Sequence, residues 1–389
     1  MQRIFVTALS VISCVGADLD RYWEGINRPR GTSPNELELP VPIPGNVDGR
    51  LARRMNRFSL MTLSASKMIM EELPADRFDE SRIGTVYTTG YGPLNSIITL
   101  SKQLESQGVD LVSPTVFTST VYNSGLGHTC LSLKLKGVST MLMGSNAIAY
   151  AADLLKADKA DVILCGGVEE YCPELEESLK SKDYTTSDQE FLCRPLDGAR
   201  SGTRVTEGSA MLMLAGEKAL TECPDAILCE IFGYASLATP HNLARDPDQA
   251  GFDAMVQVMR LALEQARLST DEIDGILMAA GGGRHVDKAE AKAIHEVFGA
   301  RASSIPAASI KGAIGETMGA SFAFNAVTAA LAIQKGMLPL TAGCLEPDRT
   351  LELDVVHKEP RAGSYRFVMV NGYDVSGCVY SAIFGAVRG

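Results

Sequence analysis

The chain has 389 residues, of which 46% are hydrophobic and 21% charged, and its formal net charge is −11. This length corresponds to two or three structural units at roughly 150 residues per domain, and the composition is that of a globular chain with a large core. The negative charge argues against nucleic acid as a partner, because phosphate binding needs a basic face.

Cysteine usage and hydropathy indicate the compartment. The nine cysteines include no pair with CxxC spacing, and several lie in apolar runs, so we expect reduced, buried thiols and no metal site. Residues 1–7 have a strand pattern without the long apolar core of a leader sequence. No run of about 18 uninterrupted apolar residues occurs, so no membrane span is predicted. We therefore expect a cytoplasmic protein.

Short apolar runs alternate with helix-period stretches along the chain, a pattern typical of an α/β fold. In chain order the first half predicts a strand at 3–7, a helix at 59–73, strands at 82–87 and 138–142, a helix at 146–156 and a strand at 161–167. The second half predicts a strand at 226–231, a helix at 254–267, a strand at 273–278 and a helix ending near Lys335.

The order of these elements repeats within the chain. Residues 59–92 and 254–283 each give a helix, an acidic turn, a strand and a glycine-rich turn. Residues 139–163 and 308–340 share a second pattern, with a helix rich in small residues. The repeat predicts two α/β halves, residues 1–220 and 221–389, with insertions at about 20–58 and 170–200 in the first half.

Several motifs in order resemble the β-ketoacyl-carrier-protein synthases, the condensing enzymes of fatty acid and polyketide assembly. The resemblance covers nearly the whole chain and implies a thiolase-like fold of five layers, α-β-α-β-α. The motifs that carry it are Gly127-His128, Gly144-Ser145-Asn146-Ala147-Ile148, Gly166-Gly167-Val168-Glu169, Arg194-Pro195-Leu196-Asp197, Glu207-Gly208-Ser209-Ala210, Asp287-Lys288-Ala289-Glu290-Ala291, and Lys311 with Gly315, Gly319 and Ala320.

The residues that perform condensation in the family are missing here. The family's cysteine lies three residues before the glycine matched by Gly144 and caps a buried helix whose dipole favours the thiolate; Met141 stands there. Its first histidine corresponds to Ala279, eight residues before Asp287. Its second histidine corresponds to Glu316, five residues after Lys311. We therefore expect no catalytic residue and no cofactor in this chain.

Part of the family's site is retained. Lys311, Glu207, Asn371 and Gly377 match family positions, and Lys311 is expected to pair with Glu316 or with Glu207. The glycine-rich gate loop of active relatives is altered, because Asp374 and Ser376 replace glycines and Val375 replaces a phenylalanine. These changes put the oxyanion-binding role of the loop in doubt.

The resemblance then implies a chain-length-factor role, in which an inactive copy pairs with an active ketosynthase and shapes its acyl tunnel. The pair forms a pseudo-symmetric heterodimer that meets an acyl carrier protein. The sequence around Pro114-Thr115-Val116-Phe117 resembles most the subunits of aryl polyene systems. Residues expected at the tunnel or interface are Asn123, Ser124, Gly125, Leu126, Ser139 and Thr140.

Two other functions stay open. One is a thiolase-fold acyltransferase with another nucleophile, for which Ser139, Ser145, Cys130 and Cys378 are candidates, with His128 two residues from Cys130. The other is a stand-alone scaffold that binds acyl chains. The triple glycine 281–283 lacks a dinucleotide-binding pattern, and it is expected to be the remnant loop of the first histidine. The other histidines, at positions 241, 285, 295 and 357, show no metal-ligand spacing.

Overall fold

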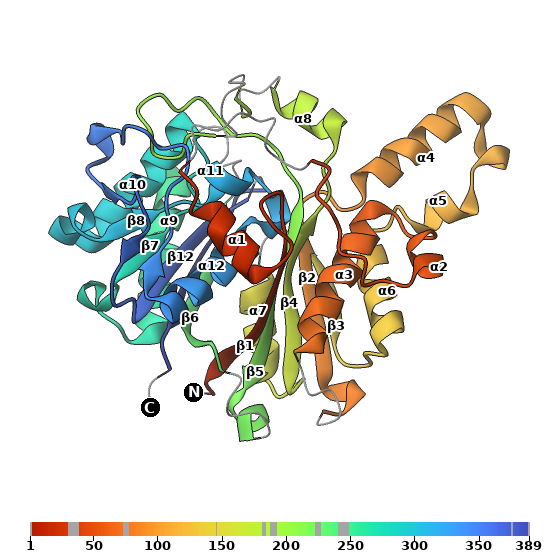
Figure 1. The fold of residues 1–389 in the computed structure, drawn as a ribbon, viewed down its shortest axis with the longest axis horizontal. Helices are drawn as coiled ribbons and strands as arrows, with labels where there is room; N and C mark the ends of the chain where they lie inside the picture. The colour runs from red at the N-terminus through yellow and green to blue at the C-terminus, as the bar shows by residue number, and fades with distance from the viewer. Residues whose placement is uncertain are drawn as a thin grey trace.

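A computed structural model describes residues 2–29, 39–72, 78–144, 146–180, 184–186, 193–221, 227–239, 249–374 and 376–387. Its strands form two similar sets, one in each half of the chain (Figure 1). The first set is β1 (Ile4–Ile12), β2 (Ile83–Thr89), β3 (Ser139–Met143), β4 (Val162–Glu169) and β5 (Gly208–Gly216). The second set is β6 (Cys229–Ala238), β7 (Gly275–Leu277), β8 (Pro306–Ala308), β12 (Phe367–Tyr373) and β13 (Cys378–Gly385).

The two sets have the same topology. In the first half the strand order is β3-β2-β4-β5-β1, with parallel pairs β3/β2 and β2/β4 and antiparallel pairs β4/β5 and β5/β1. In the second half the order β8-β7-β12-β13-β6 has the same sequence of parallel and antiparallel pairs. β1 and β6 join the sets through a short antiparallel ladder, with Ile4 opposite Ile231. The internal repeat predicted from sequence is thus a structural duplication.

Two short ladders complete the strands. β10 (Asp354–Val355) adds to the outer side of β8, while β9 (Met337–Leu338) and β11 (Arg361–Ala362) form a separate pair. The helices are α1 (Leu19–Ile26), α2 (Gly49–Ala52), α3 (Arg57–Glu71), α4 (Leu94–Gln107), α5 (Pro114–Thr118), α6 (Ser124–Leu133), α7 (Ala147–Lys156), α8 (Pro173–Lys180), α9 (Gln249–Ala266), α10 (Arg284–Phe298), α11 (Lys311–Ile314) and α12 (Ser321–Lys335).

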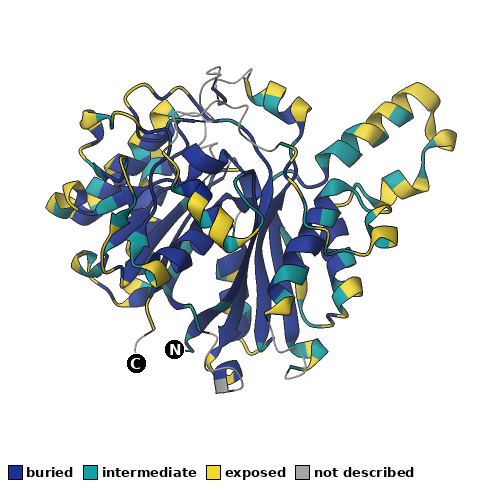
Figure 2. Ribbon diagram, viewed as in Figure 1, coloured by how far each residue is buried: buried dark blue, intermediate teal, exposed yellow. Residues whose placement is uncertain are grey.

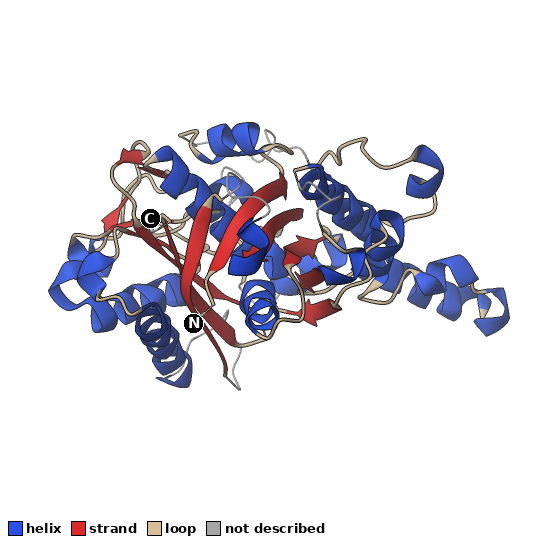
Figure 3. Cartoon of the chain, turned by 90° about the horizontal axis from the view of Figure 1, so that it is seen from below, coloured by secondary structure: helices blue, strands red, loops and turns tan. Residues whose placement is uncertain are grey.

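Helices cover the sheets in layers (Figure 3). α3 packs on β1, β4 and β5, and α9 packs on β6 and β13. α12 contacts strands of both halves, namely β12 and β13 on one side and β4 and β5 on the other, and α7 contacts β2, β4, β5 and β6. The small side chains of α12 suit this central position, because they let the helix lie close to two sheets. The arrangement agrees with the five layers expected for a thiolase-like fold.

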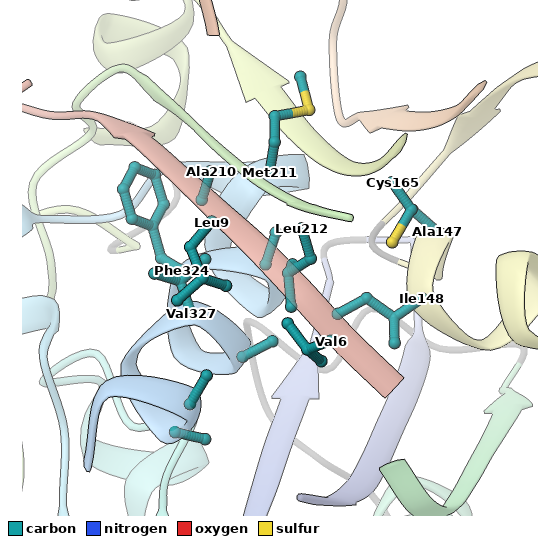
Figure 4. Packing of buried hydrophobic residues seen from close by; sticks show 14 of the residues in the cluster. Val6, Leu9, Ala147, Ile148, Cys165, Ala210, Met211, Leu212, Phe324 and Val327 are labelled. Atoms are coloured by element: carbon teal, nitrogen blue, oxygen red, sulfur yellow. The ribbon is translucent and has the colours of Figure 1, made fainter. Parts of the chain in front are cut away.

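The core is continuous between the halves. Every residue of β4 and β5 is buried, as is the larger part of α12, and side chains of β1 and β5 meet those of the central helices (Figure 4). The residues labelled there are Val6, Leu9, Ala147, Ile148, Cys165, Ala210, Met211, Leu212, Phe324 and Val327. The division near residue 220 stays a proposal; β5 ends at Gly216 and β6 begins at Cys229.

One part of the chain projects from this body. α4 and α5, joined through a 3₁₀ turn at Val109–Leu111, extend outward and are largely exposed (Figures 1 and 2). Neither helix has a buried residue. Large apolar side chains nevertheless remain in contact with solvent here, among them Val109, Leu111 and Phe117, which are 75%, 68% and 60% exposed. Across the described residues, no helix has the length and apolar character that crossing a membrane demands.

Candidate functional site

The turn between β3 and α7 is where the resemblance places a catalytic cysteine. Met141 lies inside β3, opposite Tyr87 of β2, and α7 begins only at Ala147 with Asn146 as its N-cap residue. Gly144 is a turn residue with φ +102°, not a residue of the helix. Met141 therefore lies in the strand ahead of the turn and does not itself cap α7. The match between position 141 and the family's cysteine stays a prediction.

Ala279 lies two residues after β7 and is buried. Its backbone N–H donates to Oε1 of Glu290 on α10 at 3.0 Å. Asn371 of β12 donates to the same oxygen through Nδ2 at 3.2 Å, so Ala279, Glu290 and Asn371 form one buried group. Oε2 of Glu290 has no hydrogen-bond partner. Burial raises the pKa of Glu290 to about 7, which favours its neutral form at this position.

Lys311 and Glu316 form a buried ion pair at the centre of the site. Lys311 Nζ lies 2.6 Å from Glu316 Oε2, and the two residues are 2% and 3% exposed. Glu316 Oε1 also accepts from the Met318 N–H at 2.9 Å and from the Ser321 hydroxyl. The Lys311 ammonium lies 4.8 Å from the centroid of the Tyr373 ring. Lys311, the Met318 N–H and the Ser321 hydroxyl together hold the Glu316 carboxylate in one orientation. An ionised carboxylate only accepts hydrogen bonds, so it cannot donate one to a substrate carbonyl as an imidazole can.

Glu207 does not pair with Lys311. Its carboxylate binds the Arg57 guanidinium at 2.5 Å and accepts from the backbone N–H groups of Val41 and Tyr171. Glu169 at the end of β4 plays a similar structural role. It accepts from the N–H groups of Gly90, Tyr91 and Gly319, and thereby ties β2 to the segment before α12. The alternative left open from sequence is settled in favour of Lys311 with Glu316.

The gate loop between β12 and β13 is closed on itself. The N–H groups of Ser376 and Cys378 donate to Asp374 Oδ1 at 2.9 and 3.3 Å, and Gly377 donates to the Asp374 carbonyl at 3.1 Å. These backbone donors are thus directed at Asp374. Val375, the residue at the gate position, lies outside the described residues. Asn371 lies in β12 before the loop, and Gly377 lies just before β13 with φ +93°.

A cavity of about 380 Å³ lies beside the ion pair. A Cβ at Gly281 would be 3.3 Å from Lys311 Cδ and 3.8 Å from Glu316 Oε2, so the pair stands directly behind this wall of the cavity. The lining residues are Tyr184, Ser201, Gly202, Thr203, Gly281, Gly283, Arg284, His285, Val286 and Tyr373. Sequence patterns did not predict this cavity, because its walls come from segments that are distant in the chain and meet only in the fold.

The residues expected at an interface lie on two elements. Ser139 and Thr140 are on β3, and among the described residues this strand is the last of the sheet and no other strand pairs with its outer edge. Asn123 is exposed before α6. Ser124, Gly125 and Leu126 are buried instead, with Ser124 Oγ 3.0 Å from Ser59 Oγ of α3. This turn of α6 packs onto α3, and a place for these three residues at a tunnel or interface stays a prediction.

The alternative nucleophiles are scattered. Cys130 on α6 lies 3.6 Å from Thr85 Oγ1, Cys378 lies 3.6 Å from Ser376 Oγ, and Ser139 is exposed on β3. His128 is half-buried on α6, and no hydrogen bond between it and Cys130 is present. Ser145 and His241 lie outside the described residues. His285 is at the cavity, His295 contacts the Leu351 carbonyl, and His357 the Val355 carbonyl. Within the described ranges, no group of three metal-ligating side chains occurs.

Two α/β halves of the same strand topology, with α12 in contact with strands of both, are typical of thiolase-like folds. The patterns of the β-ketoacyl synthase N-terminal and C-terminal domains match residues 45–219 and 228–344. The chain belongs to the β-ketoacyl synthase family.

Relatives match over almost the full length. A 3-oxoacyl-[acyl-carrier-protein] synthase 2 of Mycobacterium tuberculosis is 27% identical over 98% of this chain and 97% of its own. Nodulation protein E of a Rhizobium species is 26% identical over 97% of each chain. Among solved structures, a β-ketoacyl synthase from Burkholderia phymatum and the ishigamide ketosynthase/chain length factor both have a TM-score of 0.87 over 100% of each chain, at 23% and 24% identity. The structures support the fold.

Proposed function

We propose that this chain is the non-catalytic subunit of a condensing-enzyme pair, which binds an active β-ketoacyl synthase and shapes its acyl tunnel. The observation that carries the proposal is the Lys311–Glu316 ion pair, in which a carboxylate with several donors stands at the position that the resemblance matches to an imidazole. Ala279 offers no side-chain donor at the position matched to the other imidazole, and Met141 offers no thiol at the position matched to the cysteine. The chain thus lacks the imidazoles that assist decarboxylation and the thiol that accepts the acyl group.

The surface supports pairing with a second subunit. The free edge of β3 exposes unpaired backbone groups, which a strand of another chain can extend. Apolar side chains surround this edge, including Leu131 of α6 and Met143 of β3, which are 81% and 65% exposed. Exposed apolar clusters of this kind mark protein–protein contacts. A partner of the same fold, presenting the same edge, would complete a pseudo-two-fold assembly.

The projecting α4–α5 arm fits the same partner. Its apolar residues Val109, Leu111 and Phe117 are exposed, and they follow directly from the site through Gly90-Tyr91-Gly92 and α4. The arm also borders a basic groove of about 350 Å³ that includes Arg53, Arg54 and Thr115. Guanidinium groups suit the phosphate of a carrier protein's phosphopantetheine arm. A role in aryl polyene assembly remains part of the proposal and depends on the partner.

The test is reconstitution with a ketosynthase that has an intact Cys–His–His set, starting with one encoded next to this chain. We expect the two to co-purify in equal amounts, and condensation to require the partner's cysteine while its product length depends on this chain. A chain that condenses malonyl and acyl carrier proteins alone would contradict the proposal. Failure to associate with any such ketosynthase, together with acyl-chain binding by the isolated chain, would favour a stand-alone scaffold.

A further inference from the structure

The turn between β3 and α7 is occupied by a carboxylate from the other half of the molecule. A Cβ placed on Gly144 would lie 2.6 Å from Asp374 Oδ2 and 3.0 Å from the Tyr380 hydroxyl, so Asp374 stands against this turn. Asn146 donates through Nδ2 to Ser236 Oγ at 2.9 Å, and Ser236 is paired with Tyr380 between β6 and β13. Asp374 of the gate loop therefore lies against Gly144 in the turn, and Asn146 at the start of α7 contacts β6, the strand beside β13.

Asp374 is held in this place by a complete set of donors. Oδ1 accepts from the Ser376 N–H at 2.9 Å, the Cys378 N–H at 3.3 Å and the Ser376 hydroxyl, while Oδ2 accepts from the Tyr380 hydroxyl. The residue is only 7% exposed. Hydrogen bonds to a charged acceptor are strong, and several of them fix a buried carboxylate in one rotamer. The nearby N-terminus of α7 adds a favourable field for a negative charge.

We propose that Asp374 is a built-in stopper, whose carboxylate fills the space beside Gly144 in the turn that leads into α7 and excludes an acyl thioester from it. The inference rests on the proposed non-catalytic role. It gives that role a structural cause, because the chain would accept no acyl group at this turn even if a nucleophile were placed there. The carboxylate acts by volume, since it contacts Gly144, and by charge, since it repels a thiolate and the carboxylate of a malonyl group.

The test installs a thiol at the start of α7 and then removes the stopper. Asn146→Cys is compared with Asn146→Cys/Asp374→Gly and Asn146→Cys/Asp374→Asn in the full chain. Each variant is treated with iodoacetamide and with an acyl-pantetheine thioester. In the second reaction the cysteine sulfur attacks the thioester carbonyl, pantetheine leaves as its thiol, and the thiol proton passes to solvent. Peptide mass mapping separates position 146 from the native cysteines.

We expect the single variant to react slowly with both reagents. The glycine double variant should react at least about tenfold faster with both, which is the effect of a one-unit fall in thiol pKa together with opened space. The asparagine variant keeps the volume, so it should gain reactivity toward iodoacetamide but not toward the bulky thioester. Equal rates in all three variants would overturn the proposal.

Folding is checked by circular dichroism and thermal unfolding. If the glycine variant does not fold, Tyr380→Phe in the Asn146→Cys background removes one donor to Asp374 and is expected to raise the reactivity of Cys at 146 about threefold, by loosening the carboxylate. No change in that variant would also count against the stopper. The same reactions on the co-purified pair separate the Asp374 proposal from the proposed subunit role. If the chain does not pair with a ketosynthase, the complex is lost, but the reaction rates of the isolated chain stay the same.

Discussion

Lys311 and Glu316 are buried charges that depend on each other. Glu316→Gln leaves the Lys311 ammonium in a dry site without its counter-ion, and we expect a loss of about 3–5 kcal/mol in the free energy of unfolding. The exposed pair Lys102–Glu174 is the matched control, and Glu174→Gln should cost less than about 1 kcal/mol. Urea unfolding measures both. Similar losses in the two variants would show that the buried pair is not a stabilising centre.

Glu290 predicts a pH dependence of stability. Its pKa is raised by burial from 4.5 to about 7, so the folded state binds a proton that the unfolded state has released. The stability from this proton is complete below the unfolded pKa and is lost as pH rises through about 7. We expect the free energy of unfolding to fall by about 1–3 kcal/mol between about pH 5 and pH 8.

The variant Glu290→Gln isolates this contribution. It should flatten the fall, while the pKa of Glu169, also raised to about 7 by burial, affects both proteins equally. Urea titrations at several pH values provide the comparison. An identical slope in the two proteins would mean that Glu290 titrates normally in the folded chain.

At the scale of elements, strand and helix positions were largely predictable, because each half repeats the same apolar periodicity. The match of positions 279 and 316 to the family's histidines stays a prediction, which rests on their spacing from Asp287 and Lys311. The strand predicted at 138–142 is confirmed as β3, which contains Met141, but the distance from Met141 to the start of α7 at Ala147 was not predictable. The inward face of Ser124, Gly125 and Leu126 was not predictable either, because it depends on packing against α3.

The turn at Gly144 can be tested by substitution. Gly144→Ala adds a methyl group 2.6 Å from Asp374 Oδ2 at φ +102°, so we expect a loss of about 2–4 kcal/mol. Gly127 is an exposed residue of α6, and Gly127→Ala meets no atom within 4 Å, so it should gain about 0.5–1 kcal/mol from helix propensity. Thermal unfolding of both variants is the measurement. If Gly144→Ala leaves the stability unchanged, the gate loop does not approach Gly144 closely.

At the scale of the whole molecule, the proposed pairing uses the exposed apolar face around the outer edge of β3. Leu131→Glu and Met143→Glu place charges beside the free edge of β3, and each should weaken association with the ketosynthase at least about tenfold, since a charge must then be desolvated. Leu261→Glu on α9, which is also an exposed apolar position, serves as the control and should have no effect. Association is measured by analytical ultracentrifugation. Weakening by the control alone would place the interface elsewhere.

The central claim is that this chain carries no acyl group during condensation. Intact-protein mass spectrometry after incubation with acyl and malonyl carrier proteins, alone and with the ketosynthase partner, tests it directly. The account predicts that only the partner gains the mass of the acyl group while both proteins stay associated. An acyl adduct on this chain itself would contradict the account, and peptide mapping of the adduct would identify the nucleophile.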